Sequence, residues 1–106
     1  MTTLAQKTYS LLRQVPKGRV TTYKALADAL GTKAYRAIGQ LMKRNPDAPH
    51  TPCHRVVSSD GTIGGFIGKT NGAEIKKKIA LLVSEGVKIQ SNKIVDFSRI
   101  LHTFPR

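Results

Sequence analysis

The sequence predicts a mainly α-helical domain with small β elements, arranged like a winged helix-turn-helix. Two segments with the apolar spacing of helices stand on either side of a short turn that contains Gly31. Farther along the chain, one short segment is rich in β-branched residues and another alternates apolar and polar residues, and both patterns are typical of small strands. A chain of 106 residues has room for one modest core, so we expect residues 1–106 to form a single domain.

A first helix is expected over residues 4–14. Thr3 can cap its start, and the segment Pro16-Lys17-Gly18 ends it. The apolar residues of this helix recur at near-helical spacing, and they are Leu4, Leu11, Leu12 and Val15.

The next two helices form the helix-turn-helix. Thr22 can cap the first of them, and Gly31 suits the left-handed position after its end. Its apolar pattern is carried by Tyr23, Leu26, Ala27 and Leu30. The apolar stripe of the following helix comprises Ala34, Ala37, Ile38, Leu41 and Met42, and the opposite face carries Arg36, Gly39, Gln40 and Lys43. A nucleic-acid backbone could approach closely at Gly39 while Arg36 reaches inward, although ordinary core packing of two helices is the alternative.

The single cysteine, Cys53, has neighbours that suit a reactive thiol. Three prolines between residues 45 and 52 exclude a helix there and lead into the cysteine through a stiff loop. The thiolate is the nucleophile, and His54 and Arg55 are candidate sources of a field that lowers the thiol pKa. The alternative is that Cys53 is a small hydrophobic residue of the core.

Short β elements and turns are expected after the cysteine. Residues 55–57 are predicted to form a buried strand, and residues 58–61 a turn. The glycine-rich segment 63–68 could line a pocket for a flat ligand, and a plain turn fits its composition equally well. It lacks the spacing of a phosphate-binding loop. Residues 87–90 and 93–97 alternate like the strands of a hairpin.

The last helix is expected to start with a capping box of Asn71 and Glu74. The residues predicted to face inward are Ile75, Ile79, Leu82 and Val83, and the predicted solvated face is Lys76, Lys77 and Lys78. Glu85 falls at the C-terminal end, where the helix dipole disfavours a carboxylate, and this placement suggests a partner or a role.

The charge of the chain indicates its partners. Eighteen Lys and Arg against six Asp and Glu leave a formal net charge of +12, which favours salt-dependent binding of nucleic acid, with a membrane surface as the competitor. No apolar run approaches the roughly 18 residues of a spanning helix, and the start lacks an export signal, so we expect a cytosolic protein. Neither a metal nor another cofactor is expected, because His50 and His102 add no recognised ligand spacing to Cys53 and His54.

In order, these features resemble the C-terminal domain of the O6-alkylguanine-DNA alkyltransferases, which inactivate themselves by removing alkyl groups from guanine in DNA. The active-site signature of that family is matched by Pro52-Cys53-His54-Arg55-Val56. Its upstream pattern is matched by Gly18-Arg19-Val20-Thr21-Thr22-Tyr23, by Arg36-Ala37-Ile38-Gly39 and by Asn45-Pro46. The resemblance runs from about Leu4 to Gly86, and we expect a minimal module without the N-terminal domain that most of the family carries.

The resemblance implies a role for each of five residues. Cys53 would accept the alkyl group, His54 would take its proton through a water, and Glu85 would orient that histidine. Tyr23 would donate a proton to the guanine ring, and Asn45 would tie the helix-turn-helix to the active-site segment. Each molecule would react once, because thiol exchange does not reverse a thioether.

The implied partner is double-stranded DNA that contains alkylated guanine, with the damaged nucleotide flipped out from the minor groove. Arg36 would fill the vacated space. The other candidate DNA contacts are Thr22, Tyr23, Ala37, Gly39, Gln40 and Lys43. The candidate substrate pocket comprises Val56, Gly64, Gly65, Phe66, Ile67 and Gly68. Phe66 and Ile67 stand where a tyrosine and a serine are common in the family, so hydroxyl contacts to the base are lost.

Two other functions stay open. The alkyltransferase-like proteins resemble this chain in length and bind alkylated DNA without repairing it, flagging the lesion for excision-repair proteins, but they lack the reactive cysteine. A helix-turn-helix regulator is the second, for which Ala34, Ala37 and Gly39 offer few base-reading side chains. We expect a monomer that works in the cytoplasm, associated with the nucleoid.

Overall fold

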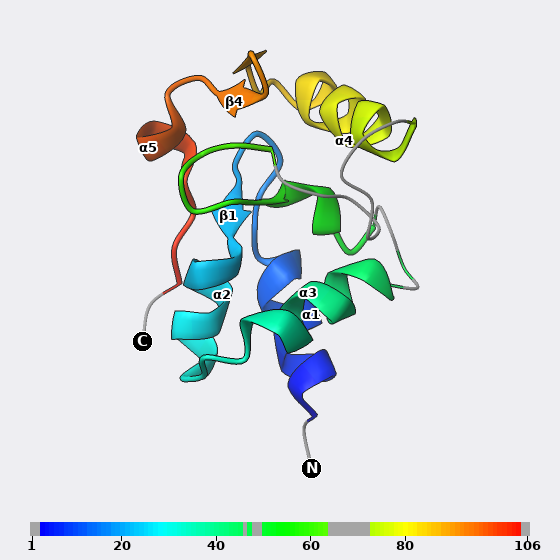
Figure 1. Ribbon diagram of the computed structural model, residues 1–106, viewed down its shortest axis with the longest axis vertical. Coiled ribbons are helices and arrows are strands. Elements are labelled where there is room, and N and C mark those ends of the chain that lie inside the picture. The colour runs from blue at the N-terminus through cyan, green and yellow to red at the C-terminus, as the bar shows by residue number, and fades with distance from the viewer. Residues whose placement is uncertain (1–2, 46, 48–49, 64–72, 105–106) are drawn as a thin grey trace.

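The computed structural model describes residues 3–45, 47, 50–63 and 73–104, and it is mainly helical with small β elements, as predicted (Figure 1). The helices are α1 (Leu4–Arg13), α2 (Tyr23–Leu30), α3 (Tyr35–Lys43), α4 (Ala73–Ser84) and α5 (Phe97–Ile100), with a 3-10 turn, η1 (Cys53–Arg55). The strands are β1 (Thr21–Thr22), β2 (Val56–Val57), β3 (Ile89–Gln90) and β4 (Lys93–Ile94). Within these ranges, no helix has the length and apolar character needed to cross a membrane.

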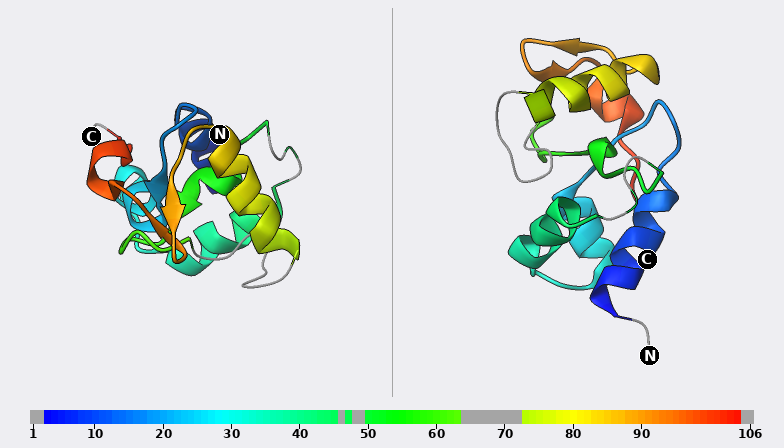
Figure 2. Two further views of the ribbon diagram at one scale, coloured as in Figure 1. Left: turned by 90° about the horizontal axis from the view of Figure 1, so that it is seen from above. Right: turned by 90° about the vertical axis from the view of Figure 1, so that its right-hand side faces the viewer.

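The parallel strands β1 and β2 lie between two groups of elements. Helices α1, α2 and α3 pack on one side of them, and α4 with the β3–β4 hairpin lies on the other (Figures 1 and 2). Successive side chains of a strand point to opposite faces. Val56 therefore joins the core that contains Cys53 and residues of α1 to α3, whereas Val57 joins the core that contains Leu82 of α4.

The first two helices begin and end within one residue of their predicted bounds, because local capping decides them, whereas α3 begins one residue after the first position of its predicted apolar stripe and has no side-chain cap. The Thr3 hydroxyl accepts a hydrogen bond from the backbone N–H of Gln6 (3.1 Å), and the Thr22 hydroxyl accepts one from that of Ala25 (3.0 Å). Gly31 adopts the expected left-handed conformation with φ +67°.

The β elements are shorter than predicted. Arg55 belongs to η1 and not to the strand, which is limited to Val56–Val57. The hairpin is present, and its two turn residues both have positive φ, which is the geometry of the tight turns that match strand twist. Phe97, expected at the end of the hairpin, instead starts α5.

The inward face of α4 differs from the prediction at two positions. Lys78, expected in solvent, is completely buried, and Val83, expected inward, is 54% exposed. The more buried positions follow the i, i+3, i+4, i+7 spacing with a lysine among them, and they are Ile75, Lys78, Ile79 and Leu82. The predicted capping box is not described, because Asn71 lies outside the described residues.

The turn after α1 contacts the end of α4 through Gly18. Its φ is +85°, a conformation that side chains with a Cβ rarely adopt. A Cβ added there would lie 3.2 Å from the carbonyl oxygen of Glu85. The glycine therefore permits the close approach of the turn after α1 to the backbone of Glu85 at the end of α4.

We expect Gly18→Ala to destabilise the fold by more than Gly31→Ala. Both residues have positive φ, which alone costs about 1–2 kcal/mol for a residue with a Cβ, but a Cβ at Gly31 would meet no atom within 4 Å. Urea unfolding of the two variants gives the comparison. Equal losses would show that contact with the Glu85 carbonyl imposes no constraint.

Candidate functional site

Cys53 is the first residue of η1 and is 4% exposed. Its sulfur belongs to the core formed by α1, α2 and α3, which includes Leu12, Leu26 and Ile38. The backbone N–H of Cys53 donates to the Thr51 carbonyl oxygen at 2.9 Å, and that of Arg55 donates to the Pro52 carbonyl oxygen at 3.0 Å. Local hydrogen bonds thus fix the segment that presents the thiol.

Asn45 connects the end of α3 to this segment. Its Nδ2 donates to the Thr51 carbonyl oxygen at 2.7 Å, and its Oδ1 accepts from the backbone N–H of Asp47 at 3.0 Å. Arg13 of α1 donates from Nε to the Thr51 hydroxyl at 3.0 Å. Two elements of the helical layer are therefore bonded to a residue two positions before Cys53.

His54 is buried with a carboxylate on one side of its ring. Nε2 lies 3.0 Å from Oε2 of Glu85, and the histidine side chain is 1% exposed. Burial lowers the pKa of His54 despite the opposing effect of Glu85, so the ring is neutral near pH 7. A carboxylate can only accept, so Nε2 carries the hydrogen and Nδ1 the lone pair. Nδ1 is buried without a hydrogen-bond partner in the described part of the chain.

Glu85 is held by Arg55 as well as by His54. Arg55 donates from Nε to Oε1 at 2.9 Å and from Nη2 to Oε2 at 2.7 Å, while Nη1 donates to the Val15 carbonyl oxygen at 2.8 Å. Burial acts to raise the pKa of Glu85, but the hydrogen bonds from Arg55 and His54 outweigh it and lower that pKa. The carboxylate is thus ionised and fixed in orientation.

The expectation that His54 and Arg55 lower the pKa of the thiol is wrong. Burial raises the pKa of Cys53, and the effects that oppose burial come from the Asn45 side chain and the charge of Lys78. Arg55 is instead bound to Glu85, and His54 is neutral. Cys53 is a thiol near pH 7 and needs a base to become a nucleophile.

Tyr23 packs against the core that contains Cys53. Burial and the neighbouring Cys53 both raise the pKa of its phenol, which keeps its proton. Tyr23 also lines a cavity of about 320 Å³ together with Lys24, Tyr35, Ser58 and Ser59. Tyr35 is 45% exposed, and it was not among the predicted site residues although it is an aromatic residue directly before Arg36.

The outer face of α3 carries most of the candidate DNA contacts. Arg36, Ala37, Gln40 and Lys43 are exposed, and Gly39 is half-buried. The exposure of Ala37 contradicts its place in the predicted apolar stripe, because α3 turns Ile38 and Met42 to the core instead. Thr22 is 5% exposed and its hydroxyl caps α2, so it offers little to DNA.

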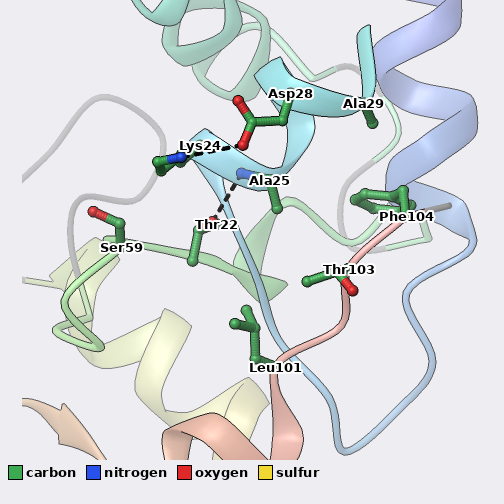
Figure 3. A pocket seen from close by; sticks show the side chains of 9 residues that line it. All are labelled: Thr22, Lys24, Ala25, Asp28, Ala29, Ser59, Leu101, Thr103 and Phe104. Atoms are coloured by element: carbon green, nitrogen blue, oxygen red, sulfur yellow. Dashed lines mark hydrogen bonds and ion pairs between the residues drawn. The ribbon is translucent and has the colours of Figure 1, made fainter. Parts of the chain in front are cut away.

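The predicted substrate pocket is described only in part. Val56 is fully buried against the core of Cys53, and Gly64, Gly65, Phe66, Ile67 and Gly68 lie outside the described residues. Figure 3 shows a different cavity, of about 360 Å³, between α2 and the segment after α5. Its lining includes Thr22 and Phe104 but none of the side chains of Cys53, His54 and Glu85. No group of three potential metal ligands occurs in the described ranges.

Comparison with known proteins gives one family. Residues 3–87 match the family model described as "6-O-methylguanine DNA methyltransferase, DNA binding domain". A methylated-DNA–protein-cysteine methyltransferase of Pyrobaculum aerophilum is 53% identical over 72 residues, which are 68% of this chain and 45% of that protein. A bifunctional methyltransferase/endonuclease of Picrophilus torridus is 45% identical over 87 residues, 81% of this chain and 28% of that protein. The chain thus spans less than half of these relatives.

Solved structures agree with this comparison. The S. pombe Atl1 protein, in complex with damaged DNA containing O6-carboxymethylguanine, superimposes with a TM-score of 0.78 and 28% identity, and the match covers 94% of each chain. The O6-methylguanine-DNA methyltransferase of Pyrococcus kodakaraensis gives a TM-score of 0.68 with 44% identity over 82% of this chain and 48% of that one. The first match confirms the fold over nearly the whole chain.

Removal of the Glu85 carboxylate is expected to destabilise the protein strongly. Glu85→Ala leaves the largely buried Arg55 guanidinium without its charge partner, which costs about 3–5 kcal/mol. Arg99→Ala is the control, because the Arg99–Asp96 pair is exposed and contributes less than about 1 kcal/mol. Urea unfolding at pH 7.5 measures both, and a loss at Glu85 no larger than that at Arg99 would contradict the assigned role of the carboxylate.

Proposed function

The chain belongs to the family of the 6-O-methylguanine DNA methyltransferase DNA-binding domain, and on that basis we propose that it repairs O6-alkylguanine in DNA by irreversible transfer of the alkyl group to Cys53. The observation that carries the proposal is the state of His54. Its Nε2–H donates to Glu85, and its buried Nδ1 holds an unshared lone pair on the residue that directly follows Cys53, whose thiol needs a base. This arrangement supports nucleophilic chemistry at Cys53.

The transfer step exchanges one proton for one alkyl group. His54 takes the thiol proton through a water, the sulfur attacks the alkyl carbon, and the bond from that carbon to O6 breaks. Tyr23, whose raised pKa keeps it protonated, supplies a proton to the guanine ring as negative charge develops there. The proton lost by the thiol balances the one gained by guanine. The thioether product is stable, so each molecule acts once and needs no cofactor.

The DNA is bound through the outer face of α3. This face combines an exposed long cation, Arg36, with the exposed Ala37 and the half-buried Gly39, and two such small residues suit close approach to a minor groove. The net charge of +12 supplies attraction that does not depend on sequence. A nucleotide flipped out of the duplex leaves a space that Arg36 fills. The protein acts in this scheme as a monomer in the cytoplasm, at the nucleoid.

The second candidate function is binding of alkylated DNA without transfer, followed by recruitment of excision-repair proteins. The observation that bears on it is the mutual 94% coverage with the S. pombe Atl1 chain, which is in complex with damaged DNA in that structure. Cys53, with the neutral His54 beside it, supports transfer instead.

Incubation with duplex DNA that carries O6-methylguanine is expected to add one methyl mass to the peptide containing Cys53. One equivalent should be transferred per protein, because the thioether is not regenerated. Peptide mass spectrometry gives the site and the stoichiometry, and Cys53→Ala is the control that binds without reacting. An intact lesion together with tight binding would exclude transfer and favour lesion flagging.

Arg36→Ala is expected to reduce the preference for damaged over undamaged duplex. Loss of a side chain that fills the vacated space costs about 1–3 kcal/mol with damaged DNA and little with undamaged DNA. Lys77→Ala is the control, because Lys77 is exposed on α4 and its loss should weaken both complexes alike. Titration of the two duplexes at one salt concentration measures the ratio. The same change of ratio in both variants would mean that Arg36 acts only as one charge among many.

A further inference from the structure

Lys78 is the lysine whose position the proposed reaction does not explain. It lies on α4 and is 0% exposed, whereas its neighbours Lys76 and Lys77 are exposed. Lysine is almost never fully buried, because its ammonium loses hydration. A leucine or methionine would fill the same volume without that cost. The retention of a charge in the core therefore points to a role for the charge.

The ammonium group of Lys78 binds both the residue that follows η1 and the first residue of the glycine-rich segment. Nζ donates to the Val56 carbonyl oxygen at 2.8 Å and to the Ile63 carbonyl oxygen at 2.6 Å. Val56 in turn donates its backbone N–H to the carbonyl oxygen of Cys53, which closes η1. Ile63 is the first residue of the glycine-rich segment 63–68 and the one residue of that segment that the structure describes. One side chain of α4 thus connects the cysteine turn to the start of the predicted substrate loop.

Lys78 also interacts electrostatically with the thiol. Its charge acts to lower the pKa of Cys53, and Cys53 in turn acts to raise the pKa of Lys78, which burial lowers to about 8. The effect of Cys53 on Lys78 is the reciprocal of the first, as required for two coupled groups. The pairing is thus between a thiol that favours its neutral form and an amine close to its own titration point.

The other ionisable groups around Cys53 cannot replace this charge. His54 is neutral, and Arg55 is bound to Glu85. Tyr9 of α1 and Tyr23 of α2 both have pKa values raised by burial and by Cys53, so they are uncharged near pH 7.

We propose that Lys78 is a positioning residue whose buried ammonium holds the Cys53 turn against the segment leading to the substrate loop and stabilises the Cys53 thiolate. Its relevance to repair rests on the proposed function. The thiolate that His54 generates then forms in the field of a cation that is fixed by the carbonyl oxygens of Val56 and Ile63. No new bond or redox step is involved, because Lys78 acts through the field of its charge and through its hydrogen bonds, which include those to the carbonyl oxygens of Val56 and Ile63.

The test uses iodoacetamide, which reacts with the thiolate and needs no DNA. Lys78→Met preserves side-chain length and removes the charge, so the rate of Cys53 alkylation at pH 7, where Lys78 is charged, should fall about tenfold. Above pH 9 Lys78 is itself neutral, so the variant and the unmodified protein should react at similar rates there. Lys77→Met, one position away and exposed, should leave both rates unchanged. A purely structural role would change the rate by the same factor at both pH values, and that result would overturn the proposal.

A second measurement needs no variant and decides the matter if Lys78→Met does not fold. The Lys78 side chain is titrated by NMR before and after alkylation of Cys53 with iodoacetamide. The alkylated sulfur cannot ionise, so the pKa of Lys78 should be lower after alkylation than before it. An unchanged pKa would contradict the proposal. Because neither experiment contains a DNA lesion, failure here is distinct from failure of alkyl transfer to Cys53.

Discussion

The site depends on one carboxylate that accepts hydrogen bonds from two side chains of η1, the cysteine turn Cys53–Arg55. Glu85 receives hydrogen bonds from Arg55 and His54, and Arg55 also bonds to the chain just after α1 through Val15. The end of α4, the cysteine turn and the helical layer are therefore joined at one point. The position of Glu85 depends in turn on Gly18, whose missing side chain allows the approach. This explains a carboxylate that would be unfavourable at an isolated helix C-terminus.

The electrostatics around Cys53 keep its sulfur protonated, and therefore unreactive, until a base removes the proton. Burial raises the pKa of the sulfur, which protects it from oxidation and from casual electrophiles, since the thiolate is the reactive form. In the proposed mechanism, the neutral His54 and the charged Lys78 both favour the thiolate, His54 by removing the proton and Lys78 by stabilising the anion that remains. Reactivity is thus reserved for a substrate that reaches the buried sulfur.

Local signals in the sequence predicted much of the helical layer, whereas contacts between residues far apart in the sequence were not predicted. Thr22 and Gly31 bound α2 through contacts within a few residues, so their roles follow from sequence. Lys78 and Val83 were assigned to the wrong faces because hydrophobic character is a poor guide where a buried carbonyl pair needs a donor. The pairing of Arg55 with Glu85 spans distant positions, and no local pattern contains it. The roles of Cys53, His54 and Glu85 came from the family motif, and the structure adds their geometry.

The central strand pair has a consequence for the order of events during synthesis. Val20 bonds to Ile100 and His102 near the end of the chain, and β1 pairs with β2 from its middle. A ribosome delivers α1, α2 and α3 first, and their mutual contacts are local enough to form early. Glu85, Lys78 and the closing segment emerge later. A nascent chain therefore carries Cys53 as an ordinary thiol, and the site is assembled only after Glu85 and the segment that bonds to Val20 have been made.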